Sequence, residues 1–410
     1  MTPSRNPTDR PRRLHFITFC GAVVLASTLS CGRSDPTVPS ESTVSVTPAS
    51  TLLVGVGEMQ PLLAQVTDAS GATLPVSVEW STDNPAVATV TAGGVATAVA
   101  TGTTRVIATA GSVSGSALLE VWVPPEVESY QPGQTHFGRA SYAEYLVGDL
   151  PIIISAPHGG PMVPQEIPDR TFGVTGRDRN TQELSRSIRE ALIERTGRAP
   201  HVIVSRLHRI KLDPNREIVE AAQGSPFAEN AWAEFHGFIE VAENIVTRDF
   251  GSGLYLDIHG HGHEIDRIEL GYLLSRDDLS DSNAALSVQG LVDKSSVRAL
   301  AGAVAITFAD LIRGPTSLGT LLQDAGIRTV PSASDPDPGG APYFTGGYNT
   351  ARHGSRDGGT VSGIQIEHHF PGLRDTEQNR EAYAAILAEA VVTYLEVHFG
   401  LGVSRVGVGK

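Results

Sequence analysis

Residues 150–160 carry the stretch Leu150-Pro151-Ile152-Ile153-Ile154-Ser155-Ala156-Pro157-His158-Gly159-Gly160, which decides the fold of the larger part of the chain. Its first half is almost wholly apolar, as is typical of a strand buried on both faces of a parallel sheet. Further buried strands are predicted at 202–205, 254–258 and 363–367. Helices are predicted at 180–196, 227–248, 300–312 and 376–398. This alternation predicts an α/β domain with a mostly parallel, mixed sheet over residues 126–400.

Chemistry-bearing residues stand at the ends of these strands, where ligands bind in open α/β sheets. His158 follows the first strand, and strand alternation places Asp257 and His259 on the face opposite Leu256 and Ile258. Neutral imidazole is a favoured zinc ligand, and a catalytic zinc takes three protein ligands and keeps one position open. The two histidines therefore predict part of a zinc site. A hydrogen-bonded pair of loop histidines is the alternative.

The strand at 363–367 ends on a carboxylate. Ile364 and Ile366 alternate with Gln365 and Glu367, which places Glu367 on the polar side of the strand at the sheet's catalytic end. A carboxylate there could act as a general base toward an attacking water. A salt-bridged strand terminus is the structural alternative.

The sequence before residue 124 has a different pattern of apolar and turn-forming residues. Short β-branched runs are separated by Gly, Asn and Asp, and they predict about seven strands and an all-β sandwich. These runs lie at 43–46, 62–66, 76–80, 86–91, 95–100, 104–109 and 116–123. Residues 43–123 resemble a bacterial Ig-like domain of group 2. The resemblance implies a module for contact with a cell surface or a glycan.

The N-terminus predicts export. A basic start, an apolar stretch from Phe16 to Leu29 and small residues up to Cys31 form a secretory signal pattern over residues 1–30. Thr28-Leu29-Ser30-Cys31 resembles a bacterial lipoprotein signal, which implies lipidation of Cys31. A plain cleaved signal is the alternative. Residues 31–42 are rich in Ser, Thr and Pro and predict a flexible tether, and residues 401–410 predict a flexible tail.

Charge narrows the range of partners. The chain has 410 residues, with 31 Lys and Arg against 45 Asp and Glu, which gives a net charge of -14. Nucleic acid is therefore excluded as the expected partner, because binding to its phosphates requires positive charge. A membrane contact is expected only through the lipid anchor.

Residues 142–398 resemble the N-formylglutamate amidohydrolase family, relatives of the zinc carboxypeptidases and aspartoacylases. The matching segments are 144–149, 155–160, 209–216, 257–261 and 363–367. The resemblance implies a zinc-dependent hydrolase that cleaves an amide bond beside a carboxylate. Its substrate would be a small anionic amide or peptide.

The resemblance assigns metal ligands position by position. His158 resembles the first zinc ligand and His259 the last. The carboxypeptidase pattern places a glutamate three residues after the first histidine, where this chain has Pro161. We favour Asp178 as the middle ligand, with Glu166 and Glu183 as alternatives. Glu183 stands three residues after Asn180, so it could instead complete a helix capping box.

The remaining site residues also follow from the resemblance. Glu367 resembles the general base, and Arg209 resembles the arginine that polarises the scissile carbonyl. Asn215 and Arg216 resemble the pair that grips the substrate carboxylate, a task suited to the planar guanidinium fork. Asp213 is expected to orient that loop. The loop at 343–354 is interpreted as a pocket wall or lid, or as an ordered surface loop.

Together these features predict an exported zinc amidohydrolase in the cell envelope, acting on N-acyl or N-formyl amino acids, small peptides or peptidoglycan fragments. The alternative is a surface adhesin or glycan-binding protein whose hydrolase domain is inactive. Two histidines too far apart to share a metal would favour this binder.

Overall fold

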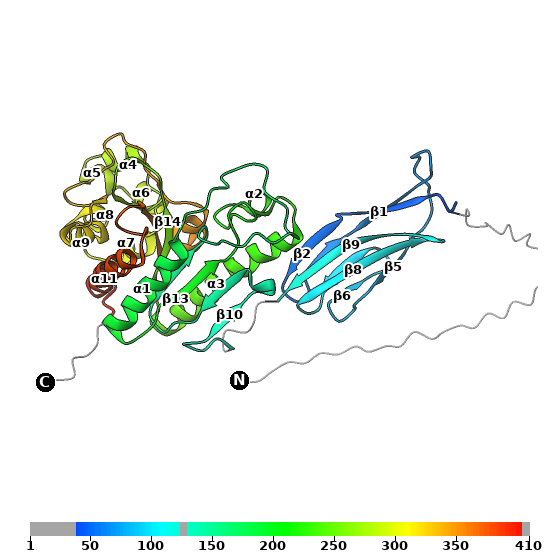
Figure 1. Cartoon of the computed structure of the whole chain (residues 1–410), viewed down its shortest axis with the longest axis horizontal. Coiled ribbons are helices and arrows are strands. Elements are labelled where there is room, and N and C mark those ends of the chain that lie inside the picture. The colour runs from blue at the N-terminus through cyan, green and yellow to red at the C-terminus, as the bar shows by residue number, and fades with distance from the viewer. Residues whose placement is uncertain (1–37, 124–128, 404–410) are drawn as a thin grey trace, which may run out of the picture.

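The computed structural model describes residues 38–123 and 129–403 (Figure 1). The predicted signal peptide, the predicted lipidation site Cys31, most of the predicted tether and most of the predicted tail lie outside the described residues.

The N-terminal region is an all-β, Ig-like sandwich. Its sheets have the orders β2-β9-β8-β5, β3-β7-β6 and β1-β4. The strands are β1 (Thr43–Thr47), β2 (Ser50–Val54), β3 (Met59–Pro61), β4 (Leu63–Thr67), β5 (Glu79–Thr82), β6 (Ala88–Val90), β7 (Val95–Ala98), β8 (Gly102–Ala110) and β9 (Val113–Trp122). Alternate residues of β8 and β9, such as Val106 and Leu119, fill the core. The sequence predicted this architecture but missed β2 and β3.

The C-terminal region contains one mixed, mostly parallel sheet of 8 strands in the order β10-β11-β13-β12-β14-β17-β15-β16. The strands are β10 (Thr135–Phe137), β11 (Ala143–Leu146), β12 (Ile152–Ala156), β13 (His201–Ser205), β14 (Gly253–Gly260), β15 (Ile268–Gly271), β16 (Thr329–Val330) and β17 (Val361–His368). The central strands β13, β12, β14 and β17 run parallel, so their carboxyl ends meet at one edge.

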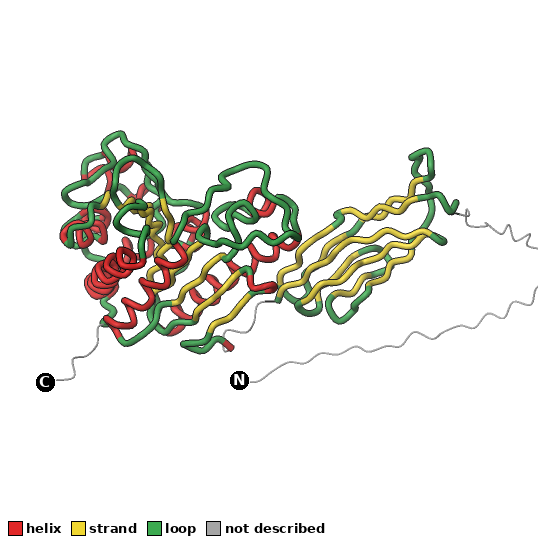
Figure 2. Tube along the Cα trace, in the orientation of Figure 1, coloured by secondary structure: helices red, strands yellow, loops and turns green. Residues whose placement is uncertain are grey.

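Helices cover both faces of this sheet (Figures 1 and 2). They are α1 (Thr181–Thr196), α2 (Ile218–Ala222), α3 (Pro226–Phe250), α4 (Arg276–Ser280), α5 (Asn283–Leu286), α6 (Gln289–Lys294), α7 (Arg298–Ala303), α8 (Phe308–Arg313), α9 (Leu318–Asp324), α10 (Tyr348–His353) and α11 (Glu377–Tyr394). Ile152 and Ile154 of β12 belong to the core cluster with α1 and α11, whereas Ile153 belongs to the cluster with α3. The apolar strand β12 is thus buried on both faces.

Local signals explain two departures from the predicted helices. The helix expected at 300–312 is broken into α7 and α8, because the Thr307 side chain caps a new helix by accepting from Asp310 N–H. The capping box considered as the alternative role of Glu183 is not formed, because the Asn180 side chain makes no capping hydrogen bond. Asn180 adopts a left-handed conformation with φ 67°, and its side chain instead donates to the Arg374 carbonyl.

The segment Glu377–Phe399 is long and apolar enough to cross a membrane by composition alone. It includes α11, which packs against α1, and 56% of the apolar window is buried inside the domain. We interpret it as a core helix.

The two regions touch through α3, which contacts β2 and β9. Gly237 leaves room for the Trp122 ring, since a Cβ there would lie 1.9 Å from Trp122 Cη2. Beside it, Arg139 Nη1 lies 2.9 Å from Glu120 Oε1, and Arg139 N–H donates to Glu234 Oε1 at 2.7 Å. One arginine therefore links two buried carboxylates across the contact.

Candidate metal centre and active site

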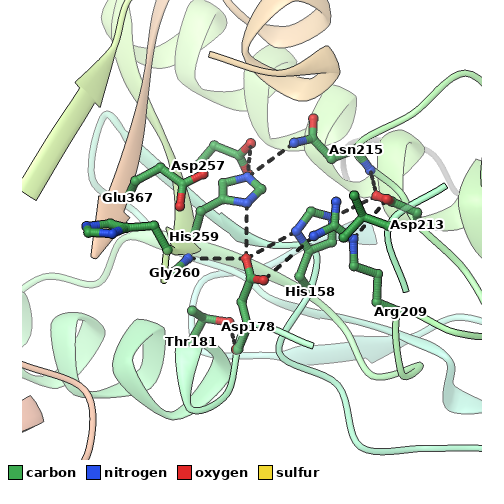
Figure 3. A network of polar contacts seen from close by, with 12 residues as sticks. His158, Asp178, Thr181, Arg209, Asp213, Asn215, Asp257, His259, Gly260 and Glu367 are labelled. Carbon is green, nitrogen blue, oxygen red and sulfur yellow. Dashed lines mark hydrogen bonds and ion pairs between the residues drawn. The ribbon is translucent and has the colours of Figure 1, made fainter. Parts of the chain in front are cut away.

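Three parallel strands deliver the candidate site. His158 lies two residues beyond β12, while His259 and Glu367 face each other in register on β14 and β17. Asp178 comes from the loop before α1 and reaches the same edge of the sheet (Figure 3). Residues separated by about 200 positions in the chain therefore meet where the carboxyl ends of the strands converge.

His158, Asp178 and His259, here called the first cluster, have the spacing of metal ligands. Asp178 Oδ2 lies 3.3 Å from His158 Nδ1 and 3.4 Å from His259 Nδ1. With zinc–ligand bonds of about 2.0–2.1 Å, neighbouring ligands of a tetrahedral ion are separated by about 3.3 Å. The two imidazole rings lie 4.8 Å apart at a steep angle. These three atoms fit one small divalent cation.

Two outer carboxylates fix the orientation of both imidazoles. Asp213 Oδ1 lies 2.7 Å from His158 Nε2, and Asp257 Oδ2 lies 2.7 Å from His259 Nε2. An ionised carboxylate only accepts hydrogen bonds, so each Nε2 carries its proton and the neutral ring keeps a lone pair on Nδ1. Both lone pairs then face the Asp178 oxygen. Three acceptors in contact require a cation or an added proton, and outer carboxylates of this kind usually accompany metal-bound histidines.

The charge state of the first cluster agrees with this requirement. Burial opposes ionisation of Asp178, but the neighbouring His158 and His259 imidazoles hold its pKa well below the usual range. Burial likewise opposes charge on His259, yet Asp257 and Asp178 raise its pKa well above the usual value. The pocket thus favours a positive charge between fixed carboxylates.

Glu367 stands beside the first cluster in an unusual state. It is buried, its Oε1 accepts from Gln365 Nε2 at 2.9 Å, and its Oε2 accepts no hydrogen bond within the described parts of the chain. Burial, reinforced by nearby carboxylates, raises the pKa of Glu367 to about 8. A buried carboxyl group with a raised pKa and an unpartnered oxygen is a candidate for exchanging a proton with a molecule in the cavity.

These groups line one cavity of about 160 Å³. Its lining residues are His158, Asp178, Arg209, Asn215, Arg216, His259, Gly260, Phe344, Gly346, Gly347, Gln365 and Glu367. A larger hollow of about 520 Å³ is lined by α1 and α11, and its charged residues are glutamates and arginines. Size alone would select that hollow, but the smaller cavity holds the ligand atoms and the unpaired carboxyl oxygen.

The residues predicted to bind substrate also lie in this cavity. Arg209 Nε donates to Asp213 Oδ2 at 2.9 Å, and its Nη1 lies 3.7 Å from Asp178 Oδ1. Asn215 is buried, with Oδ1 accepting from Asn349 N–H at 2.8 Å. Arg216 is one-third exposed and its Nε contacts Glu220 at 3.2 Å. Two guanidinium groups therefore border a cavity that is otherwise rich in carboxylates.

The alternative middle ligands lie elsewhere. The Glu166 carboxylate accepts a hydrogen bond from the Tyr142 hydroxyl, and Glu183 lines the hollow beside α1 and α11. His368 is buried, donates from Nδ1 to the His259 carbonyl and contacts the Tyr383 hydroxyl through Nε2. Burial lowers the pKa of His368 to about 3, so this ring is neutral.

Sequence reasoning missed the bond from Asp213 to His158. Asp213 was expected to orient its own loop, and it does so by accepting from Asn215 N–H at 3.1 Å. Its second role depends on the folded position of a loop 55 residues from His158, for which the sequence offers no local signal.

A second group with metal-ligand composition was not predicted. His261, His263 and Glu269, here called the second cluster, offer ligand atoms within 4.8 Å of one another. Glu269 Oε1 accepts from His263 Nδ1 at 3.0 Å and from Arg267 Nη2 at 3.2 Å. His261 Nε2 donates to the Arg267 carbonyl, and its Nδ1 accepts from His263 N–H. The buried Arg267 supplies the positive charge here.

Comparison with known proteins agrees with the two-part architecture. Residues 42–121 match the bacterial Ig-like domain (group 2) family. No curated protein matches the chain.

Among solved structures, an N-formylglutamate amidohydrolase from Ralstonia eutropha JMP134 is 14% identical, covering 66% of this chain and 97% of that one, with a TM-score of 0.36. A metallopeptidase-like protein from Shewanella denitrificans OS217 is 12% identical, covering 63% and 79%, with a TM-score of 0.24. Domains 5–6 of the S-layer protein SbsC are 15% identical, covering 25% and 58%, with a TM-score of 0.19.

Proposed function

We propose that the C-terminal region is a metal-dependent hydrolase that cleaves an amide bond next to a carboxylate. The observation that carries this proposal is that Asp178 Oδ2 lies 3.3 Å from His158 Nδ1 and 3.4 Å from His259 Nδ1. Beside them, Glu367 Oε2 has no hydrogen-bond partner among the described residues. Zinc is the proposed ion because two imidazoles and one carboxylate are a common catalytic zinc set.

A divalent cation held by the first cluster would supply the charge that acidifies water and polarises a carbonyl. Glu367 would take a proton from the attacking water and return it to the leaving nitrogen. Arg209 would donate to the developing oxyanion, and Asp213 holds its guanidinium in place through Nε.

Recognition of the substrate is assigned to Asn215 and Arg216. Their loop follows Asp213, so the proposed carboxylate clamp and the orientation of His158 depend on one segment. The far field of a chain with net charge -14 repels anions, so an anionic substrate needs these local cations. The volume of about 160 Å³ favours an N-acyl or N-formyl amino acid, or the end of a small peptide or peptidoglycan fragment.

We place the protein in the cell envelope, exported and anchored through Cys31. The support is the signal pattern over residues 1–30 together with the Ig-like domain, a kind typical of bacterial surface or extracellular proteins. The adhesin with an inactive hydrolase domain is less well supported, because the two histidines lie within reach of one ion.

The test is metal analysis of the purified full chain, combined with turnover of N-formyl, N-acetyl and peptide substrates. We expect bound zinc in both wild type and Glu367→Gln, with turnover lost only in the variant. Turnover unchanged in Glu367→Gln would remove Glu367 as the base. A wild type that neither binds zinc nor turns over any substrate would contradict the proposed function.

A further inference from the structure

We propose that Phe344 forms an apolar subsite at the rim of the cavity, and that the substrate bears an apolar side chain beside its carboxylate. This subsite rests on the proposed function, because it lies in the same cavity. Its substrate class would be the N-acyl derivatives of apolar amino acids, either free or at the end of a peptide.

Phe344 stands out from the other side chains that line the cavity. The remaining lining residues are glycines or carry charged, imidazole or amide groups. Phe344 is 42% exposed, although it lies among buried polar groups. A partly exposed apolar residue that lines a polar cavity gains free energy when a ligand covers its side chain, and the polar groups of the cavity fix the orientation of that ligand.

The segment 342–347 is fixed to the sheet along its length. Arg267 Nη2 donates to the Pro342 carbonyl at 3.0 Å, and the Tyr343 hydroxyl donates to the Leu270 carbonyl. Leu273 N–H donates to the Thr345 carbonyl at 2.6 Å. Gly346 has φ 115° and packs against β15, where a Cβ on Gly271 would lie 2.5 Å from Gly346 N. The segment is therefore a fixed wall.

The second cluster holds Phe344 itself. Glu269 Oε2 accepts from Phe344 N–H at 2.9 Å. The Phe344 ring stacks on the His263 ring, with centroids 4.8 Å apart and planes within 5°, and His263 is oriented by its bond to Glu269. Glu269 is also the register partner of Glu367, so the anchor of the ring and the proposed base lie on adjacent strands. This geometry assigns the second cluster to positioning Phe344.

The test is isothermal titration of N-formyl-L-phenylalanine and N-formyl-L-alanine into the zinc-supplemented Glu367→Gln full chain. Apolar contacts in enzyme pockets discriminate by about 10- to 200-fold, so we expect at least tenfold tighter binding of the phenylalanine derivative. Adding Phe344→Ala should reduce this preference to less than about threefold. Equal affinities, no measurable binding of either compound, or a preference that survives Phe344→Ala would overturn the subsite.

Two controls separate a contact from a general effect. Phe137 of β10 is also exposed, at 50%, and does not line the cavity, so Phe137→Ala should keep the preference. His263→Phe keeps an aromatic ring stacked on Phe344 and should preserve the preference for the phenylalanine derivative better than His263→Ala. If both variants lose this preference equally, the ring at position 263 does not position Phe344. Turnover by the wild type tests the proposed function separately, since hydrolysis without side-chain preference would refute the subsite alone.

Discussion

The first and second clusters contain the same residue types, two histidines and a carboxylate, but differ in where the protons and the positive charge lie. In the first cluster, the Nε2–H groups of His158 and His259 donate to Asp213 and Asp257. The Nδ1 atom of each imidazole therefore faces the Asp178 oxygen. In the second cluster both Glu269 oxygens already accept hydrogen bonds, and Arg267 neutralises the carboxylate. Ligand-type residues in proximity therefore do not define a metal site. A metal site is defined by several hydrogen-bond acceptors that face one another without a positively charged group between them.

Position in the fold reinforces this difference. The first cluster lies at the carboxyl ends of the parallel strands β12 and β14, where the sheet opens to a ligand. In the second cluster, Glu269 lies on β15, which pairs antiparallel with β17, whereas His261 and His263 lie in the loop after β14. Through Glu269 and His263 this cluster holds Phe344. One cluster is suited to chemistry and the other to support.

The largest effect should come from removing a ligand of the first cluster. Asp178→Asn replaces an anionic oxygen with a neutral amide and should lower kcat/KM by about 10⁴-fold or more, because the cation and its chemistry are lost together. The matched variant Glu269→Gln should lower it by less than about tenfold on N-formyl-L-alanine. Steady-state assays with added zinc measure both. Equal losses in the two variants would remove the distinction between the clusters.

The second largest effect concerns Glu367 of β17, whose register partner on β15 is Glu269. Glu367→Gln should lower kcat by about 10²- to 10⁴-fold, since a general base contributes about that much, while zinc content stays at the wild-type level. Pre-steady-state and metal measurements on the same preparations check this. If zinc were lost together with turnover, Glu367 would be a ligand and not the base.

A smaller effect is expected from the outer carboxylates. Asp213→Asn and Asp257→Asn each leave an imidazole less firmly oriented and should weaken zinc affinity by about 10- to 100-fold. Competition with a chromogenic chelator measures the affinity. Unchanged affinity in both variants would mean that the Nε2 bonds do not prepare the site.

The smallest effect concerns a third carboxylate group, at the contact between the two regions, where Arg139 serves both Glu120 and Glu234. Burial, only partly offset by Arg139, raises the pKa of Glu120 from 4.5 to about 7. The folded state therefore binds a proton that the unfolded state releases near pH 4.5, so stability declines as the pH rises from 4.5 through 7. Calorimetry should show Tm falling by roughly 2–4 °C between pH 6 and 8. The fall should be smaller in Glu120→Gln, and an identical pH dependence would contradict this assignment.

Much of the site could be predicted from the sequence because its residues stand at recognisable strand ends. His158, His259 and Glu367 follow or end apolar runs, and the sheet brings such ends together whatever loops connect them. Asp178 was favoured from the family resemblance alone, and the structure places its Oδ2 in contact with both imidazoles.

The rest could not be predicted because it depends on long-range packing. Which imidazole nitrogen faces Asp178 is decided by Asp213 and Asp257, and the Asp213 loop is positioned by the whole domain. The contact of Glu269 with Phe344 joins residues 75 positions apart. The short strands β2 and β3 were missed for a related reason, since their pairing partners β9 and β7 are distant in sequence.

The most direct measurement is anomalous diffraction at the zinc edge from crystals of the full chain grown with zinc. We expect one strong peak about 2.0–2.2 Å from His158 Nδ1, Asp178 Oδ2 and His259 Nδ1, and no peak at His261, His263 and Glu269. A peak at the second cluster, or none at the first with both imidazoles ordered, would contradict the central claim that the arrangement of protons makes the first cluster the metal site.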